Sequence, residues 1–200
     1  MKQYYCLISI LYFVHNTCLA QVHVNKEWEA VGGTPLRFDW SASIANAANQ
    51  LTTTGNTIVS GQGANILIAR YNVNSSIAWE AIFNTSGTNN DYGVALAQDL
   101  TGNTYVVGAT DNGDSTNYDV VVLKYNSMGM LQWSQTYNSA YSKNDIGSGI
   151  TIDINGDVYV CASSEGDGTG YDFLVLKYNA SGTLQWSNRY DYKALVTKYR

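Results

Sequence analysis

Few residues of this 200-residue chain have the types and spacing that chemistry requires. Acidic side chains gather in two similar loops, where they could bind calcium or the hydroxyl groups of a ligand: Asp111, Asp114, Glu165 and Asp167. The segment 153–157 offers a further calcium candidate, with Asp153, Asn155 and Asp157 at alternate positions. However, the twelve-residue order of an EF-hand loop is absent, and the intervening Gly156 is typical of a tight turn. Calcium therefore stays an alternative, and we expect no cofactor.

Histidine and cysteine are scarce after residue 20. His23 is the only histidine there and Cys161 the only cysteine, so the usual zinc sites and a Ser-His-Asp arrangement are excluded. Cys161 ends the apolar run 158–161, and we expect it to be buried as a small hydrophobic residue. Carboxylate pairs for glycoside hydrolysis are available, as in any acidic chain, but nothing marks one pair as buried. We predict that the protein is not an enzyme.

The charge balance also limits the partners. The chain has a net charge of −5, and nucleic-acid binding requires clustered positive charge, so a nucleic-acid partner is not expected. Aromatic residues are abundant, with 16 tyrosines and 5 tryptophans. Exposed rings in the loops around Tyr118, Tyr141 and Tyr171 would offer flat faces on which sugars stack. The candidate ligand-binding residues are thus these tyrosines and the loop acids, and the candidate partner is a protein or a glycan.

The elements that must position these residues form a tandem repeat. The spacing is 54 and then 53 residues between three recurrent tyrosines (Tyr71, Tyr125 and Tyr178). It is the same between three recurrent tryptophans (Trp79, Trp133 and Trp186). A fixed period of this size indicates one supersecondary unit copied in tandem. We expect the recurrent residues to be structural: Trp79, Asp99, Tyr125, Trp133, Asp153, Tyr178 and Trp186.

Basic residues follow the same period. Arg70, Lys124 and Lys177 each precede a recurrent tyrosine, and the acids Asp91 and Asp145 recur as well. Because these charges keep the repeat period, we expect structural ion pairs or backbone contacts, with the aliphatic stems lying on apolar surface.

Each unit has the pattern of four short strands separated by turns rich in Gly, Asn and Asp. In the middle unit we place these strands at about 93–98, 104–110, 119–125 and 131–137. The third of them is apolar on both faces, which requires sheets stacked above and below it. We therefore predict an all-β, propeller-type array of about three four-stranded antiparallel blades, with the tryptophans wedged between blades. Propellers usually close with four to eight blades, so the array is an incomplete propeller.

Segments outside the repeat have other roles. A basic start at Lys2, an apolar run at Cys6–Val14 and a small residue at Ala20 are typical of a secretory signal peptide, and the run is too short to span a membrane. Its removal takes away one lysine, so the net charge goes from −5 to −6. We expect a secreted or cell-surface protein without a transmembrane segment. The predicted division is a signal peptide at 1–20, a lead-in at 21–27, repeats at 28–190 (about 28–78, 79–132 and 133–186 plus a last strand) and an off-pattern tail at 191–200.

The chain resembles the bacterial secreted β-propeller repeat family, the seven-bladed β-propeller repeat type. The resemblance lies in Asp-x-x-Gly-Asn-x-Tyr-Val-x-Gly at 99–108 and Asp-x-x-x-x-Lys-Tyr-Asn-x-x-Gly-x-x-x-Trp at 119–133, and it recurs at 153–186. It covers roughly residues 28–190 and implies an exported, commonly non-catalytic scaffold or interaction module, with no catalytic residues to transfer. The chain departs from it in having only about three units.

These observations favour a structural or protein-interaction scaffold at the bacterial cell exterior, with a carbohydrate-binding module as the alternative. Three units form only an arc, whose end blades would each leave an apolar face uncovered. We therefore expect either a piece of a longer propeller or self-association through the uncovered end blades.

Overall fold

The computed structural model describes residues 42–45, 50–74, 76–111, 117–168 and 170–191. Twelve strands within these ranges form three four-stranded antiparallel sheets, and the same ranges contain no helix. The predicted all-β array of three four-stranded blades is confirmed. The predicted signal peptide (1–20), the lead-in (21–27), residues 28–41 of the first repeat and residues 192–200 of the tail lie outside the described residues.

Each sheet consists of four strands that are consecutive in the chain and hydrogen-bonded in that order. The first sheet contains β1 (Ala42–Ala45), β2 (Leu51–Ile58), β3 (Ala64–Tyr71) and β4 (Ile77–Phe83). The second contains β5 (Asp91–Gln98), β6 (Thr104–Thr110), β7 (Asp119–Tyr125) and β8 (Leu131–Tyr137). The third contains β9 (Asp145–Ile152), β10 (Val158–Gly166), β11 (Gly170–Tyr178) and β12 (Leu184–Tyr190).

The middle sheet matches the strands expected from the sequence almost residue for residue. Three of its strands have the predicted bounds, and β5 begins two residues earlier than expected, at Asp91. The earlier start arises because Asp91 and Tyr92 still pair with Thr110 and Ala109 of β6. A bulge between Gly93 and Ala95 separates this paired entry from the rest of the strand.

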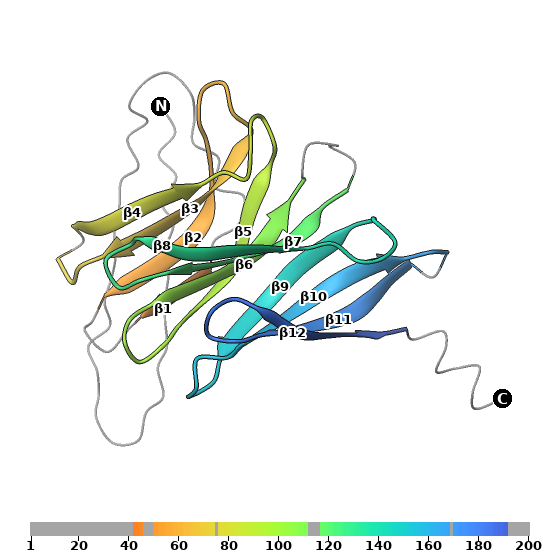
Figure 1. Cartoon of the computed structure of the whole chain (residues 1–200). Coiled ribbons are helices and arrows are strands. Elements are labelled where there is room, and N and C mark those ends of the chain that lie inside the picture. Colours follow the sequence, from red (N-terminus) through yellow and green to blue (C-terminus); the bar gives the residue numbers. More distant parts are fainter. Residues whose placement is uncertain (1–41, 46–49, 75, 112–116, 169, 192–200) are drawn as a thin grey trace.

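The three sheets follow one another as a stack, with the first and third on either side of the second (Figure 1). One apolar cluster joins the first two sheets through Ile66, Ile68 and Leu123, among others. A second cluster joins the second and third sheets through Val120, Val122 and Leu176, among others. All four residues of the run 120–123 are fully buried, so the predicted burial of this strand on both faces is confirmed.

Tight turns at one end of the second and third sheets close as the sequence predicts. Asp99 accepts hydrogen bonds on its carboxylate from Thr101, Asn103 and Tyr105, and Gly102 takes a positive φ of 82°. The turn after Asp153 is built in the same way, with amides of Asn155 and Asp157 donating to its carboxylate. These bonds hold the β5–β6 and β9–β10 turns closed.

The repeat counted from tryptophan to tryptophan and the sheets of the fold differ in phase. Each recurrent tryptophan lies on the fourth strand of a sheet. A unit counted from a tryptophan therefore combines the fourth strand of one sheet with the first three strands of the following sheet. The sheets themselves span residues 42–83, 91–137 and 145–190.

One expectation about the core is wrong. Cys161 is exposed, although its counterpart in the second sheet, Val107, is fully buried. The two residues occupy equivalent places, opposite Val175 and Val122 on the neighbouring strand. Val107 is covered by the third sheet, whereas no described sheet covers the outer face of the third sheet itself.

Candidate functional site

The junction between the first two sheets is built around a cation and an indole from the first sheet. Arg70 on β3 donates to the carbonyl oxygens of Ser127 (3.1 Å) and Gly102 (2.9 Å) and to the hydroxyl of Thr104 (2.8 Å), all in the second sheet. Trp79 on β4 donates its indole N–H to the same Ser127 carbonyl at 3.1 Å. The guanidinium also lies over the indole ring, 5.0 Å from its centre. The predicted backbone contact of the recurrent base is confirmed here.

The junction between the second and third sheets repeats this geometry. Lys124 donates to the Ala180 carbonyl at 3.3 Å, and the Trp133 indole donates to the same oxygen at 3.3 Å. The Trp133 ring stacks on Tyr178 with 6.5 Å between ring centres. At the first junction the Trp79 ring stacks in the same way on Tyr125, at 6.3 Å. In both cases the accepting group is a turn between the third and fourth strands of the next sheet.

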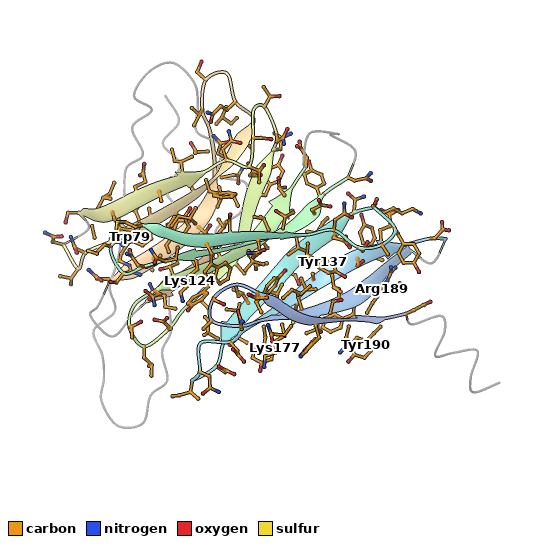
Figure 2. The ribbon with its side chains drawn as sticks, viewed as in Figure 1. Trp79, Lys124, Tyr137, Lys177, Arg189 and Tyr190 are labelled. Atoms are coloured by element: carbon orange, nitrogen blue, oxygen red, sulfur yellow. The ribbon has the colours of Figure 1, made fainter. Side chains whose placement is uncertain are left out.

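The third sheet carries the same two residues, but no further sheet among the described residues lies on that side. Trp186 is 40% exposed and contacts Tyr159 of its own sheet, edge to face. Lys177 forms an ion pair with Asp157 of its own sheet, at 2.8 Å between Nζ and Oδ2. The predicted ion pair of the recurrent base is thus found in the third sheet. In Figure 2, Trp79 and Lys124 lie within the stack, whereas Lys177 and Tyr190 lie on its outer side along the third sheet.

Apolar residues complete this surface, which we call the open face. Phe173 (52% exposed) and Tyr190 (54% exposed) contact each other across β11 and β12. Their counterparts in the second sheet, Val120 and Tyr137, pack against the third sheet. The open face consists of Tyr159, Cys161, Phe173, Val175, Lys177, Trp186 and Tyr190.

Burial and hydrogen bonding shift the pKa values of groups along the junctions. Burial lowers the pKa of Arg70, which stays charged in the first junction. Burial raises the pKa of Tyr125 to about 12 and also raises the pKa of Tyr178, so both rings under the indoles are neutral phenols. The hydrogen bond to Asp157 is the main cause that raises the pKa of Lys177. The open face therefore presents aromatic and apolar groups beside the Lys177–Asp157 ion pair.

The acids predicted as ligand-binding residues lie at the opposite end of the sheets, where the loops between second and third strands emerge. Asp111 is buried and accepts hydrogen bonds from the backbone and side-chain nitrogens of Asn90, at 2.9 and 3.0 Å. Glu165, at the equivalent place in the third sheet, accepts from the side chain of Asn144 at 2.8 Å. Each asparagine lies in the connection between two sheets and also accepts a bond from the preceding sheet. Asp111 and Glu165 therefore help to join neighbouring sheets.

The recurrent acids that follow these asparagines do not pair with the recurrent bases. Asp91 accepts hydrogen bonds from the amide and hydroxyl of Thr85, at 3.0 and 2.8 Å, and Asp145 accepts one from the amide of Ser139 at 2.6 Å. Both carboxylates are buried and hold the connection that leads from one sheet into the next.

The remaining candidate residues lie in or beside the connections β6–β7, β8–β9 and β10–β11. Asp167 is exposed and lies 3.5 Å from the Lys143 ammonium, and Asp114 falls outside the described residues. Tyr141 and Tyr171 are 51% and 57% exposed, whereas Tyr118 is half-buried against Tyr92. Across the described parts of the chain, no cluster of three or more His, Cys, Asp or Glu side chains could hold a metal ion.

Sequence reasoning missed Arg189, which the neighbouring repeats replace with other residues. Its guanidinium binds the buried Asp172 carboxylate through two nitrogens, at 2.9 and 2.6 Å, and covers the Tyr141 ring at 4.9 Å. It occupies the place of Thr136 on β8, so only a residue-by-residue comparison of repeats would have singled it out. Sequence reasoning likewise missed Phe173 and Tyr190. Their counterparts in the second sheet, Val120 and Tyr137, are covered by the third sheet, so the repeat pattern gave no sign that these positions are exposed in the third sheet.

Comparisons with known proteins agree with this architecture. The sequence model of the beta-propeller repeat family, SBBP, matches residues 132–168, from the fourth strand of the second sheet to the loop after β10. A comparison with curated proteins found no match. In the described part of the chain, no helix has the length and apolar character needed to cross a membrane.

Proposed function

We infer that this protein is an exported, non-catalytic β-propeller repeat protein that serves as a protein-interaction scaffold at the bacterial cell exterior, and that the open face receives its partner. The observation that carries this proposal is the exposure, on the third sheet, of the residue set that joins the first sheet to the second and the second to the third. Lys177, Trp186 and Phe173 occupy the places of Lys124, Trp133 and Val120. An apolar surface of this kind, with an ion pair at one end, is typical of a protein-binding surface.

Export rests on the sequence of residues 1–20, and the absence of a catalytic site rests on the scarcity of histidine and cysteine. Intact-mass measurement on protein recovered outside the cytoplasm should show a chain that starts at Gln21. Recovery of unprocessed protein from the cytosol alone would contradict export.

The scaffold role is tested by placing a photo-crosslinking amino acid at Phe173 and, as a control, at Leu100, which is 93% exposed in a turn away from the open face. After irradiation of cells that produce each variant, a discrete protein adduct is expected from position 173 but not from position 100. Equal adduct patterns from the two positions would contradict the open face as a binding surface.

A carbohydrate-binding role is the second candidate, because Tyr141 and Tyr171 are half exposed at the loop end. Arg189 lies over one face of the Tyr141 ring, and in this role a sugar would stack on the other face. A glycan array distinguishes the candidates: glycan binding that is lost in Tyr171→Ala but kept in Trp186→Ala would favour the carbohydrate-binding role over the scaffold.

A further inference from the structure

Large apolar side chains are exposed at one end of the stack, which we call the turn end. It consists of the turns that follow β3, β5, β7, β9 and β11, on the lower left of Figure 1. Arg70 and Lys124 connect these turns between sheets, because each donates to turn carbonyls of the next sheet. The first residue of each fourth strand is an exposed leucine or isoleucine. The most exposed apolar residues of the second and third sheets are also here: Leu100 (93%), Ile154 (87%), Met128 (68%) and Met130 (54%).

Leu100 and Ile154 occupy the same place in successive sheets, directly after the turn acids Asp99 and Asp153. Side chains with so much exposed surface make little contact within the fold, so packing does not explain their apolar character. A single exposed leucine is ordinary, whereas a group of exposed apolar residues marks a surface that contacts a protein or a membrane. The turn end therefore has the composition of a contact surface.

The turns of this end satisfy backbone amides from within. The Asp99 carboxylate accepts hydrogen bonds from two amides of its turn, and the Asp153 carboxylate does the same. In the β7–β8 turn, the Asn126 side chain accepts from the amides of Met128 and Met130, at 3.0 and 2.9 Å. A backbone amide that enters an apolar phase costs free energy unless it is hydrogen-bonded. These turns can therefore enter the boundary of a lipid layer with those amides paired and their apolar side chains leading.

Charge distinguishes the turn end from the opposite end of the sheets. At the turn end three acids are accompanied by three bases: Asp99, Asp153 and Asp157 with Arg70, Lys124 and Lys177. At the opposite end, the described acids outnumber the described bases, which are Lys143 and Arg189. These acids include Asp91, Asp111, Asp119, Asp145, Asp167 and Asp172. A membrane that contains anionic lipids has a negative surface potential, so it repels the opposite end and lets the turn end approach.

We propose that the turn end is a membrane-binding surface, which inserts Leu100, Ile154 and the two methionines into the boundary between lipid headgroups and acyl chains. The occupant is a lipid layer and not a folded protein, because the apolar side chains project from separate turns whose amides are already paired. A fluid layer adapts to separate apolar tips, whereas a protein partner needs a continuous complementary surface. This surface is additional to the open face, and the proposal does not depend on the role of the open face.

The test measures flotation of the full chain with vesicles of phosphatidylcholine alone, or with about one fifth phosphatidylglycerol. The natural chain should bind both kinds of vesicle. The variant Leu100→Ser with Ile154→Ser should lower the partition coefficient at least about tenfold, because two large apolar side chains no longer leave water. Both residues are almost fully exposed, so this variant should fold, which circular dichroism and urea denaturation check.

The matched control is Ile58→Ser with Ile82→Ser. It replaces two isoleucines that are 46% and 49% exposed and lie outside the turn end, so the control should bind vesicles as the natural chain does. An equal loss of binding in the two double variants would overturn the turn end as the inserted surface. Absence of binding by the natural chain at about 5 mM lipid would overturn the proposal altogether. Binding that requires phosphatidylglycerol and is abolished by salt would overturn insertion in favour of charge attraction.

The photo-crosslinking amino acid at position 100 separates a lipid from a protein as the occupant. In cells that produce this variant, a lipid adduct is expected at position 100 and no discrete protein adduct. A discrete protein adduct there would overturn the lipid layer in favour of a protein partner. None of these outcomes changes the adduct expected at Phe173, so failure of this proposal and failure of the proposed function are distinguishable.

Discussion

The indole of Trp133 lies directly on the backbone of Gly182, with its N–H bonded to the Ala180 carbonyl at 3.3 Å. Trp79 and Gly129 repeat this relationship at the other junction, where the indole bonds to Ser127. The same contact, between the fourth strand of one sheet and the turn after the third strand of the next sheet, therefore occurs at both junctions. Because the two residues come from different sheets, this contact stabilises the stack itself and not a single blade.

The first prediction concerns that contact. Gly182→Ala should lower the free energy of unfolding by at least about 2 kcal/mol more than Gly168→Ala, because its Cβ would overlap the indole in addition to straining the backbone. Gly168 is the matched control: its φ is 74°, close to the 84° of Gly182, and no atom lies within 4 Å of its Cβ position. The control should cost about 1–2 kcal/mol from backbone strain alone. Chemical denaturation of both variants measures the difference, and equal costs would contradict the packing role of the glycine.

The second prediction compares two tryptophans at the same place in the repeat. Trp133→Ala should cost about 3–5 kcal/mol, because it empties the space between Tyr178 and Tyr105. Trp186→Ala should cost less than about 2 kcal/mol, because its ring is already 40% exposed. Urea denaturation followed by circular dichroism tests both values. A cost for Trp186→Ala as large as that for Trp133→Ala would mean that the outer face of the third sheet is covered in solution.

The contrast between Val107 and Cys161 shows which features of the fold can be predicted from the sequence and which cannot. Strand positions, turns and the double burial of β7 follow from local patterns, because strand period and turn chemistry are properties of a few neighbouring residues. Burial in a stack depends instead on whether a sheet lies in front of the residue. Two equivalent residues in similar strands therefore have opposite environments, which no local pattern of residues 158–161 records.

The loop acids show a second limit. Asp111 and Glu165 stand in polar loops of variable length, where ligand-binding residues are common. Their partners, Asn90 and Asn144, lie 21 residues away in the connections between sheets. Pairing over such a distance follows from the stacking of the blades. Sequence patterns therefore singled out Asp111 and Glu165 as candidate binding residues but could not predict their asparagine partners.

A third prediction follows from the turn at Asp99. Burial acts to raise the pKa of Asp99, but hydrogen bonds from Thr101, Asn103 and Tyr105 outweigh it and lower the pKa below its usual value. A carboxylate with a lowered pKa stabilises the fold fully above the unfolded pKa of about 4, and this contribution is lost as the pH falls below that value. Asp99→Asn should therefore cost about 1–2 kcal/mol at pH 7, and the difference from the natural chain should shrink toward pH 2.

Urea denaturation of both chains across this pH range provides the measurement. Asp167→Asn is the control, because that carboxylate is exposed and only 3.5 Å from Lys143, so its removal should change stability by less than about 1 kcal/mol. A cost for Asp99→Asn that stays constant down to pH 2 would contradict the charged hydrogen bonds of the turn.

A chain of hydroxyl groups distinguishes the second sheet from the third. The Thr85 hydroxyl bonds to Asp91 at 2.8 Å and to the Thr110 hydroxyl at 2.9 Å. The equivalent residues of the third sheet are Ser139, Asp145 and Ser164, and Asp145 pairs with Ser164 as Asp91 pairs with Thr110. Here the two serine hydroxyls and Oδ1 of Asp145 are buried and have no hydrogen-bond partner within the described residues. Serine lacks the methyl group that restricts χ1 of threonine, so its hydroxyl is not held toward the carboxylate.

The last prediction restores this chain. Ser139→Thr with Ser164→Thr should raise the free energy of unfolding by about 1 kcal/mol, because two fixed hydroxyls would satisfy Asp145 and each other. Each single change should yield less than half of this gain, since a hydroxyl-to-hydroxyl bond needs both partners in place. The matched control is the reverse exchange, Thr85→Ser with Thr110→Ser, which should lower stability by a similar amount. Denaturation of the single and double variants gives the coupling between the two sites. A double serine-to-threonine variant less stable than the natural chain would show that the third sheet has no room for the two methyl groups.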